Sequence, residues 1–377
     1  MLPLAGIKVV EIAENIAGPY AGQILALLGA EVLKIERPEG DAGRGWGPPF
    51  YGDASTTFHA CNQNKQSVVL DFNSADDLAW LRARIGRSDV LVQNMRPGSL
   101  EKFGLGSEAL RFADPRLIYV SLWALGAVGP QRLAPGYEPM VQALSGMFSL
   151  NGDPAGAPSR VGMQVLDLGT GVWAALGAIA ALHRRQVTGQ GAIVDGSLLE
   201  TAMGWMGPHW AAYAGSGKLP ARDRSGNPRV VVFQALPTAD RELVVAAAND
   251  RLFAKLATEL GHPEWAADPR FVTNADRAGN KDVIIGLISE IMRLKPSSHW
   301  QERLDAIGVP CAPINDLSDL LGNPQVQALG MLTSPPGMDL PLMGLPLSFD
   351  GVRPTVHHGA PGLGEHTALL RQHASGN

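Results

Sequence analysis

The sequence has little cysteine and no excess of basic charge. Cys61 and Cys311 are the only cysteines among 377 residues, and they lie far apart without CxxC or His/Cys spacing. This argues against a disulfide framework and against a zinc site, so we expect two buried, reduced thiols. The net charge is −5, and the basic residues are spread along the chain. A nucleic-acid-binding surface, which needs clustered basic charge, is therefore not expected.

Long apolar runs and common catalytic motifs are also missing. The opening MLPLAGIKVVEIAEN interrupts its apolar run with Lys8 and Glu11, which fits neither a signal peptide nor a spanning helix. We expect a cytoplasmic protein with no membrane partner. The chain has no HExxH, no GxSxG and no carboxylate cluster suited to a metal, so no metal site is predicted.

The sequence does contain a repeated alternation of strand and helix periodicity over its first 125 residues. The expected strands are 8–13, 31–37, 67–72, 90–94 and 117–123. Helices are expected at 21–30 and at 74–85, the second capped by Ser74. This alternation predicts an α/β fold with a doubly wound parallel sheet.

The rest of the chain indicates a second, smaller domain. A long buried helix is expected at 168–185, then a strand at 192–198 and a helical segment at 199–215. A hairpin within 233–250 and charged helices over 251–306 follow, and the tail from 334 to 366 is expected to wrap a surface. We divide the chain into a large domain (1–216), a linker (217–229), a small α+β domain (230–322) and a C-terminal segment returning to the large domain (323–377).

Several cations follow strands of the predicted sheet. Ligands of open parallel sheets bind beyond the carboxyl ends of the strands. Arg37 ends the second strand, and Asn94, Arg96 and Lys102 lie in the loop and turn after a later one. Three cations placed there can hold a phosphorylated ligand by charge-assisted hydrogen bonds. For any one of them taken alone, a solvated surface charge is the more common role, and it is their shared placement that favours a binding site.

A nicotinamide dinucleotide is one phosphorylated candidate. Glu36 lies at a suitable distance after the first turn to meet a ribose. However, the turn ENIAGPYAG contains only Gly18 and Gly22, so the GxGxxG pattern is absent, and Pro19 removes an amide donor. This disfavours an NADP-dependent dehydrogenase.

Asp167, in the stretch PSRVGMQVLDLGTG, is an isolated acid between an apolar pair and the long predicted helix. It can serve as the helix N-cap, or as a nucleophile toward an activated acyl group such as a thioester. The two roles can coexist, because the helix dipole favours an ionised carboxylate at this end. The nearby Gly162, Gly169 and Gly171 would leave room for a ligand to approach the backbone.

A set of segments in order along nearly the whole chain carries a resemblance. They are LAGIKVVEIAENIAGPYAGQILALLGAEVLKIERP, NKQSVVLDF, NMRPGSLEKFGLG, YEPMVQALSG, RVGMQVLDLGTG, TGQGAIVDGSLLE, ADPRFVTNADR, GVPCAPIND and LGEHT. Together they resemble the family III CoA-transferases of the CaiB/BaiF type, which include formyl-CoA:oxalate and carnitine CoA-transferases. The resemblance implies a Rossmann-like large domain and a small domain within an interlocked homodimer.

The resemblance also implies a mechanism and a set of site residues. Asp167 would attack a donor acyl-CoA to give a mixed anhydride, the CoA thiolate would return to form an aspartyl-CoA thioester, and a small carboxylic acid would then accept the CoA. Glu138 would lie near the reaction centre, and CoA would be a substrate, with no tightly bound cofactor. The implied CoA contacts are Ile16, Ala17, Arg37, Leu70, Asn94, Met95, Arg96 and Lys102.

Two features limit what the resemblance implies. The related acyl-CoA racemases carry a His-Asp pair where this chain has Tyr137 and Glu138, which disfavours racemisation. Some transferases close a glycine-rich loop over the intermediate, but region 217–232 offers only SGNPR. Three alternatives stay open: an acyl-CoA racemase or isomerase, an NADP-dependent dehydrogenase, and a CoA-binding protein without chemistry.

Overall fold

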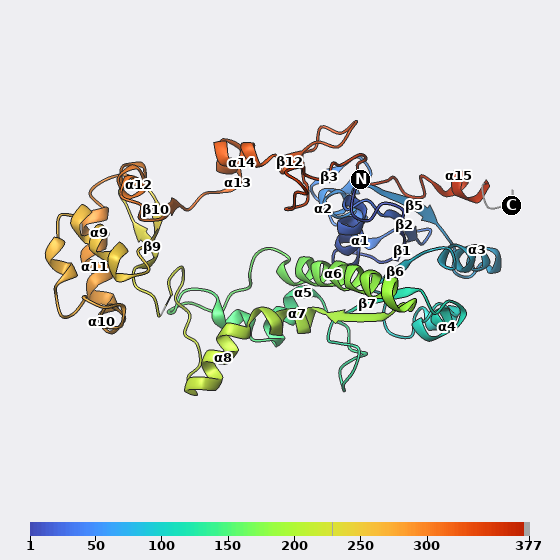
Figure 1. The fold of residues 1–377 in the computed structure, drawn as a ribbon, viewed down its shortest axis with the longest axis horizontal. Helices are drawn as coiled ribbons and strands as arrows, with labels where there is room; N and C mark the ends of the chain where they lie inside the picture. The colour runs from blue at the N-terminus through green and yellow to red at the C-terminus, as the bar shows by residue number, and fades with distance from the viewer. Residues whose placement is uncertain (228, 373–377) are drawn as a thin grey trace. The chain divides into compact units, whose positions relative to one another are not determined.

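The computed structural model describes residues 1–227 and 229–372, which form two compact units (Figure 1). The first unit contains Met1–Met147, Arg160–Ser216 and the described residues from Ala328 onward, and the second contains Phe148–Ser159 and the described residues of Gly217–Gln327. Pro228 of the predicted linker and residues 373–377 of the predicted C-terminal segment lie outside the described residues.

The first unit is built on a six-stranded parallel sheet. Its strands are β1 (Lys8–Ile12), β2 (Glu31–Glu36), β5 (Lys65–Val69), β6 (Val90–Gln93), β7 (Ile118–Trp123) and β8 (Ile193–Ser197). They lie in the order β5-β2-β1-β6-β7-β8, with every neighbouring pair parallel. Counted along the chain this is 3-2-1-4-5-6, the strand order of the doubly wound Rossmann sheet. The predicted parallel α/β sheet is confirmed.

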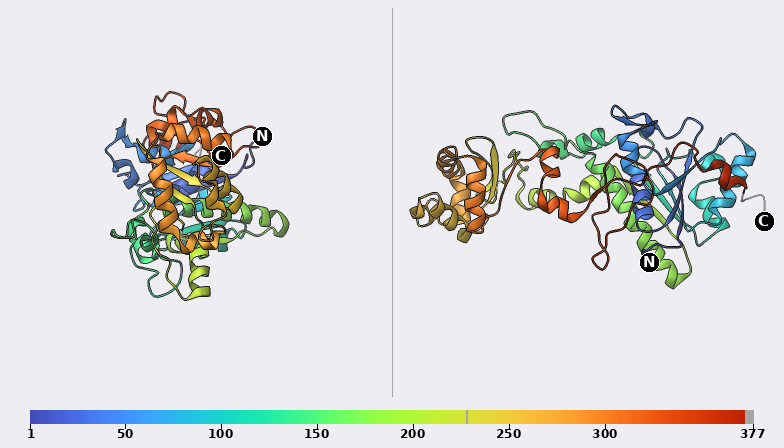
Figure 2. Two further views of the ribbon diagram at one scale, coloured as in Figure 1. Left: turned by 90° about the vertical axis from the view of Figure 1, so that its left-hand side faces the viewer. Right: turned by 90° about the horizontal axis from the view of Figure 1, so that it is seen from above.

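Helices cover both faces of this sheet (Figure 2). Successive strand residues point to opposite faces, so Val9 joins one core and Val10 the other. The Val9 side packs against α1 (Ala17–Leu27) and α6 (Val165–Thr188). The Val10 side packs against α3 (Ala75–Ile85) and α4 (Ser107–Ala113). Ser74 caps α3 by accepting from Asp77 N, as predicted.

Shorter elements complete the first unit. They are η1 (Ala42–Gly45), β3 (Phe50–Tyr51), β4 (Ala54–Ser55), α2 (Thr56–Cys61), η2 (Glu101–Phe103), α5 (Glu138–Leu144), α7 (Leu198–Trp205), α8 (Gly207–Ser216), β12 (Leu332–Thr333), β13 (Leu342–Met343) and α15 (Thr367–Gln372). The helical segment expected at 199–215 is two helices, α7 and α8. Their Met203, Trp205 and Trp210 are exposed in this chain, although a run of Met and Trp is more often core.

Among the described residues, α6 is the one helix long and apolar enough to cross a membrane by length and composition, and half of its most apolar window is buried within the structure. Two glycines let other helices approach it closely. A Cβ on Gly171 would lie 2.8 Å from Ala17 O of α1, and one on Gly169 would overlap the Trp205 ring of α7. The expectation that these two glycines leave room for a ligand is therefore wrong. Gly162 does face open space.

The second unit contains an antiparallel sheet of β9 (Phe233–Pro237), β10 (Glu242–Ala246) and β11 (Cys311–Pro313). Its other elements are α9 (Asp250–Glu259), η4 (Pro263–Ala266), α10 (Asn274–Gly279), α11 (Lys281–Met292), α12 (Ser297–Ala306) and α13 (Leu317–Leu321). Helices η3 (Met147–Leu150) and α14 (Pro324–Leu329) lie where the chain passes between units. The predicted hairpin within 233–250 is confirmed.

Residues 148–159 belong with this second unit, whereas the sequence placed them in an unbroken large domain. Arg222 joins them to that unit, because its guanidinium donates to the backbone oxygens of Asp153 and Gly156. The two cysteines also differ from each other. Cys61 is buried, as expected, while Cys311 is only half-buried, and both are free thiols.

The C-terminal tail runs along the edge strand β5. His366 N donates to Ser67 O at 2.9 Å, and Asn64 N donates to His358 O at 3.1 Å. Val69 N donates to Thr367 Oγ1 at 3.0 Å. The expectation that the tail wraps a surface is confirmed, and the tail satisfies backbone donors that an edge strand would otherwise expose.

Candidate active site

The candidate site lies where the strand order of the sheet reverses, between β1 and β6. Ligands of doubly wound sheets bind at this position, beyond the carboxyl ends of the strands. The side-chain amide of Asn94, after β6, joins the two loops there. It accepts from Glu14 N at 2.9 Å and donates to Glu14 O at 2.7 Å. Asn94 was predicted to contact CoA, and its side chain is already used to shape the crevice.

Two cavities meet at this edge and share Met95 as a wall. The larger has a volume of about 530 Å³ and is lined by Arg37 and Lys102. The smaller, of about 190 Å³, is lined by Asp167 and Glu138. The structure thus brings the cations that follow the strands and the two acids Glu138 and Asp167 to one edge of the sheet.

The predicted residues divide between these cavities. The smaller cavity takes Ile16, Ala17, Asn94, Met95, Arg96, Glu138 and Asp167, and the larger takes Arg37, Met95 and Lys102. Leu70 lines neither, because its side chain is fully buried in the core between the sheet and α3. Its N–H also donates to Glu36 O, so a contact from Leu70 to a ligand would have to come from its carbonyl.

The three cations differ in their availability. Arg37 is 51% exposed and forms an ion pair of 2.7 Å with Glu14. Burial raises the pKa of Glu14, and the charge of Arg37 opposes that rise without cancelling it. Arg96 and Lys102 are exposed, and within the described part of the chain their side chains make no hydrogen bond or ion pair. Two free cations and one engaged cation therefore border the cavities.

Asp167 lies in the first turn of α6 and not at its N-cap. The helix begins at Val165, with Gln164 as its N-cap residue, so the N-cap interpretation of Asp167 is wrong. Burial raises the pKa of Asp167 to about 7, and the charge of Glu138 adds to the rise. Desolvation and the charge of Glu138 thus oppose the helix dipole, which favours the ionised form of the carboxylate.

Glu138 is the first residue of α5 and is 4% exposed. Its Oε1 accepts a hydrogen bond from the side chain of Gln142. Its Oε2 is buried and has no hydrogen-bond partner within the described residues. The cavity therefore holds two carboxylates of which one, Glu138, is fixed in place and the other, Asp167, takes up a proton near neutral pH.

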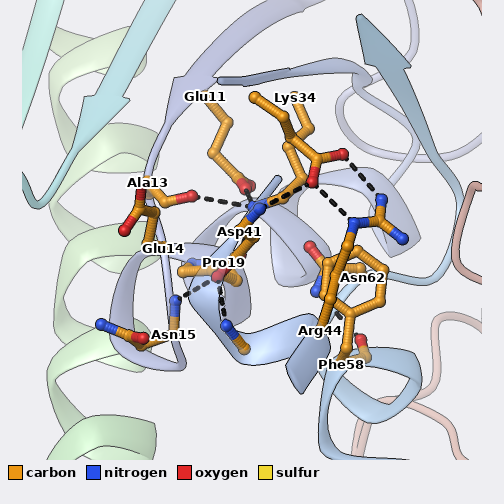
Figure 3. A network of polar contacts seen from close by, with 12 residues as sticks. Glu11, Ala13, Glu14, Asn15, Pro19, Lys34, Asp41, Arg44, Phe58 and Asn62 are labelled. Carbon is orange, nitrogen blue, oxygen red and sulfur yellow. Dashed lines mark hydrogen bonds and ion pairs between the residues drawn. The ribbon is translucent and has the colours of Figure 1, made fainter. Parts of the chain in front are cut away.

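A buried ionic network supports the loop after β1 (Figure 3). Lys34 Nζ contacts Glu11 Oε1 at 3.0 Å, Asp41 Oδ2 at 2.8 Å and Ala13 O at 2.8 Å. Asp41 Oδ1 in turn accepts from Asn15 N at 2.8 Å. Asn15 has a left-handed backbone with φ 71°, a conformation that costs energy unless its surroundings fix it. The network thereby fixes the backbone conformation just before Ile16 and Ala17, which line the smaller cavity.

The same network continues beneath α1. Lys65 Nζ pairs with Glu11 Oε2 at 2.7 Å and donates to Pro19 O at 2.7 Å. Burial lowers the pKa of Lys65 to about 8, whereas for Lys34 the charges of Glu11 and Asp41 overcome burial and raise the pKa. Gly22 is required above this pair, because a Cβ there would overlap Glu11 Oε2.

Sequence reasoning did not identify this network, although a signal was present. Glu11 and Lys34 each interrupt an apolar strand of a parallel sheet, and such strands are buried on both faces. Charges at those positions must be paired. Sequence reasoning also missed three residues near the nucleophile: Trp46 and Arg132, which line its cavity, and Gln142, which bonds to Glu138.

Comparison with known proteins agrees with this geometry. The sequence model of CoA-transferase family III matches residues 4–367. The chain belongs to this family. Family III membership makes it an enzyme that uses CoA thioesters, and it removes the dehydrogenase and the non-catalytic alternatives.

Two curated family III relatives are similar over nearly the whole chain. The acetyl-CoA:oxalate CoA-transferase of Acetobacter aceti is 36% identical over 98% of this chain and 95% of its own length. The succinate–glutarate CoA-transferase of Agrobacterium fabrum is 35% identical over 98% and 94%. Among solved structures, a CAIB/BAIF family protein from Brucella suis superposes with a TM-score of 0.89, at 36% identity and 99% coverage of both chains.

Proposed function

We propose that this family III CoA-transferase moves CoA from an acyl-CoA to a small carboxylic acid through an aspartyl-CoA thioester on Asp167. One observation above all supports the proposal. Asp167 lies in the cavity at the strand-order reversal, beside a second carboxylate and next to a larger cavity bordered by cations. That arrangement suits a nucleophile that must meet a thioester whose CoA part is highly charged.

In the proposed mechanism, a carboxylate oxygen of Asp167 bonds to the acyl carbon while the C–S bond breaks and CoA leaves as a thiolate. The thiolate then attacks the Asp167 carbonyl of the mixed anhydride and releases the donor acid as a carboxylate. The acceptor carboxylate next attacks the aspartyl thioester, and the returning thiolate takes the new acyl group. No net proton or water is consumed, so the site needs to position reactants and exclude water.

The two cavities suggest how acyl-CoA lies. The nucleotide would occupy the 530 Å³ cavity, with Arg37 and Lys102 near its phosphates. The thioester end would pass Met95 to reach Asp167. The raised pKa of Asp167 makes its carboxylate more basic than usual and hence a better nucleophile once ionised.

For the acceptor we propose a short dicarboxylic acid. The relatives named above are called oxalate and succinate–glutarate CoA-transferases. An acceptor anion must enter a cavity that already holds Glu138 and Asp167, so it needs a compensating cation. Arg96 and Arg132 line that cavity, and in the described chain their side chains have no ion-pair partner.

We further propose an interlocked, cytoplasmic homodimer, whose large domain, linker, small domain and returning segment are divided as the sequence predicts, except that residues 148–159 belong with the small domain. Support comes from an apolar surface on α6, α7 and α8 that one chain leaves to solvent, including Trp173, Leu176, Met203 and Trp210. Exposed apolar side chains on helices that contact one another, as α6 and α7 and then α7 and α8 do, are typical of a protein interface.

Trapping the intermediate tests the mechanism. Wild-type enzyme mixed with acyl-CoA under single-turnover conditions, then quenched and digested, should yield a peptide that contains Asp167 and carries CoA. Hydroxylamine should release the CoA. Asp167→Asn should bind acyl-CoA and lose transferase activity by several decades, because an amide lacks the attacking anion. If no labelled peptide forms and the Asn variant transfers CoA at the wild-type rate, the mechanism is wrong.

A further inference from the structure

Gln142 is fully buried on α5, one turn after Glu138. Hydrogen bonds hold both the nitrogen and the oxygen of its side-chain amide. Its Nε2 donates to Glu138 Oε1 and, at 3.3 Å, to Val161 O, while its Oε1 accepts from Val161 N at 2.9 Å. Val161 lies four residues before α6 begins. One side chain thus joins the helix that carries Glu138 to the segment that leads into the helix of Asp167.

These contacts also determine how Glu138 is oriented. With Oε1 held by Gln142, Oε2 stays buried without a partner in the described part of the chain, and Glu138 lines the same cavity as Asp167. Two neighbouring carboxylates repel each other, and an unrestrained Glu138 would turn away to relieve the repulsion. The Gln142 N–H group opposes that movement, because it bonds best to an unprotonated carboxylate oxygen.

We propose that Gln142 is a positioning residue for CoA transfer, which holds the negative charge of Glu138 beside Asp167. The inference rests on the aspartyl mechanism proposed above. When an Asp167 oxygen bonds to the acyl carbon and the CoA thiolate departs, Asp167 loses its charge, and its repulsion from Glu138 ends. An interaction that destabilises the reactant but not the covalent intermediate favours the first step.

Of the titratable groups around Asp167, Glu138 is the one that raises its pKa. The titratable groups near it are Tyr20 of α1, Cys61 of α2, Glu138 of α5, and Arg96, Arg132 and Tyr137 of the surrounding loops. On α7, Glu200 is engaged by Ser197. After burial itself, Glu138 is the group that raises the pKa of Asp167. Any movement of Glu138 should therefore alter how the reaction depends on pH.

Two substitutions test the inference by steady-state kinetics across pH. Gln142→Leu removes the donor, so kcat should fall roughly tenfold or more, the size of one lost charge-assisted hydrogen bond. The acid limb of kcat/KM should move to lower pH, and KM for acyl-CoA should change little. Gln142→Glu keeps the shape, but its new carboxyl group can donate to Glu138 only when protonated. Its kcat should therefore recover as the pH is lowered.

Gln23 provides a matched control. It is a buried glutamine of α1 that likewise joins two chain segments, donating to Ala60 O and accepting from Gln63 N, both at 2.8 Å. It does not line the cavity of Asp167. Gln23→Leu and Gln23→Glu should lower the melting temperature comparably and leave the acid limb in place. An equal displacement in the Gln23 variants would make the effect structural and overturn the inference.

A double substitution keeps the test decisive if Gln142→Leu is poorly stable. Glu138→Gln should move the acid limb in the same direction, and Glu138→Gln with Gln142→Leu should move it no further, because both changes act on one charge. Additive displacements, or wild-type pH profiles in both Gln142 variants, would overturn the role of Gln142. If wild-type enzyme still yields the CoA-labelled Asp167 peptide, that failure leaves the aspartyl mechanism intact.

Discussion

Asp167 links activity to stability at the scale of a single residue. Its pKa rises from 3.8 in an ordinary aspartate to about 7 in the fold. Between these values the unfolded chain releases the proton more readily than the folded protein does, so Asp167 reduces stability as the pH rises from about 4 to 7. Asp167→Asn removes this ionisation. The variant should be more stable than wild type at pH 8 by on the order of 1–3 kcal/mol, with a much smaller difference near pH 4.

Denaturant unfolding at both pH values measures the difference. A stability gap between Asp167→Asn and wild type that is the same at pH 4 and pH 8 would contradict the burial of Asp167 as the cause. The prediction also gives a reason why an inactive variant should be the more stable one: a site that holds a half-buried acid beside a second acid is destabilising until substrate arrives.

The cations bordering the two cavities give a second prediction at this scale. Lys102→Ala or Arg96→Ala should weaken acyl-CoA binding by roughly one to two decades, the size of a charge-assisted hydrogen bond, with little loss of stability. Arg37→Ala should cost less, because Arg37 already pairs with Glu14. Calorimetric titration with acyl-CoA measures the change. Arg87→Ala is the control, because Arg87 is exposed near the amino ends of β1 and β2. Unchanged affinity for acyl-CoA in all three cavity variants would mean that these cations are solvated surface charges that do not bind CoA.

At the scale of the element, the loop after β1 depends on charges buried beneath it. Lys34→Met should lower the free energy of unfolding by roughly 3–5 kcal/mol, because it leaves Glu11 and Asp41 buried without their cation. Arg270→Ala, which breaks the exposed pair with Asp268, should lower the free energy of unfolding far less, because solvent screens that pair. Urea unfolding followed by circular dichroism compares the two, and equal losses would contradict a structural role for the buried network.

The sequence predicted those parts of the fold that depend on local periodicity. The strands of the parallel sheet and the Ser74 cap of α3 were found because alternation and capping act over a few residues. Arg37, Arg96 and Lys102 could be grouped in advance, since the carboxyl ends of parallel strands meet at one edge of the sheet.

What the sequence could not predict depends on partners distant in the chain. The start of α6 was placed too late, because Asp before a helix is commonly a cap and the packing that extends α6 to Val165 comes from other helices. Gly169 is fixed by Trp205, and Glu11 by Lys34 and Lys65. The partners in each pair are more than twenty residues apart in the sequence. Hydrophobic periodicity describes only a short window of residues, so it cannot predict such contacts.

At the scale of the whole molecule, the proposed dimer is tested by dilution. Sedimentation velocity across a concentration series should show no monomer before helical signal is lost, because interlocked chains cannot separate while folded. Leu176→Asp, on the exposed face of α6, should disturb assembly, whereas Phe112→Asp, on the exposed surface of α4, should not. A folded monomer of the wild-type chain at low concentration would contradict the interlocked arrangement.

The hydrogen bonds between β5 and the C-terminal tail constrain the order in which the protein can fold during translation. During synthesis the strand order β5-β2-β1-β6-β7-β8 can be assembled once residue 197 has left the ribosome. The residues that bond to Ser67 and Val69 emerge only after the whole second unit, from His366 and Thr367. The edge of the sheet therefore stays open while more than 150 further residues are translated, and a nascent chain stalled in this interval offers a free strand edge to its neighbours.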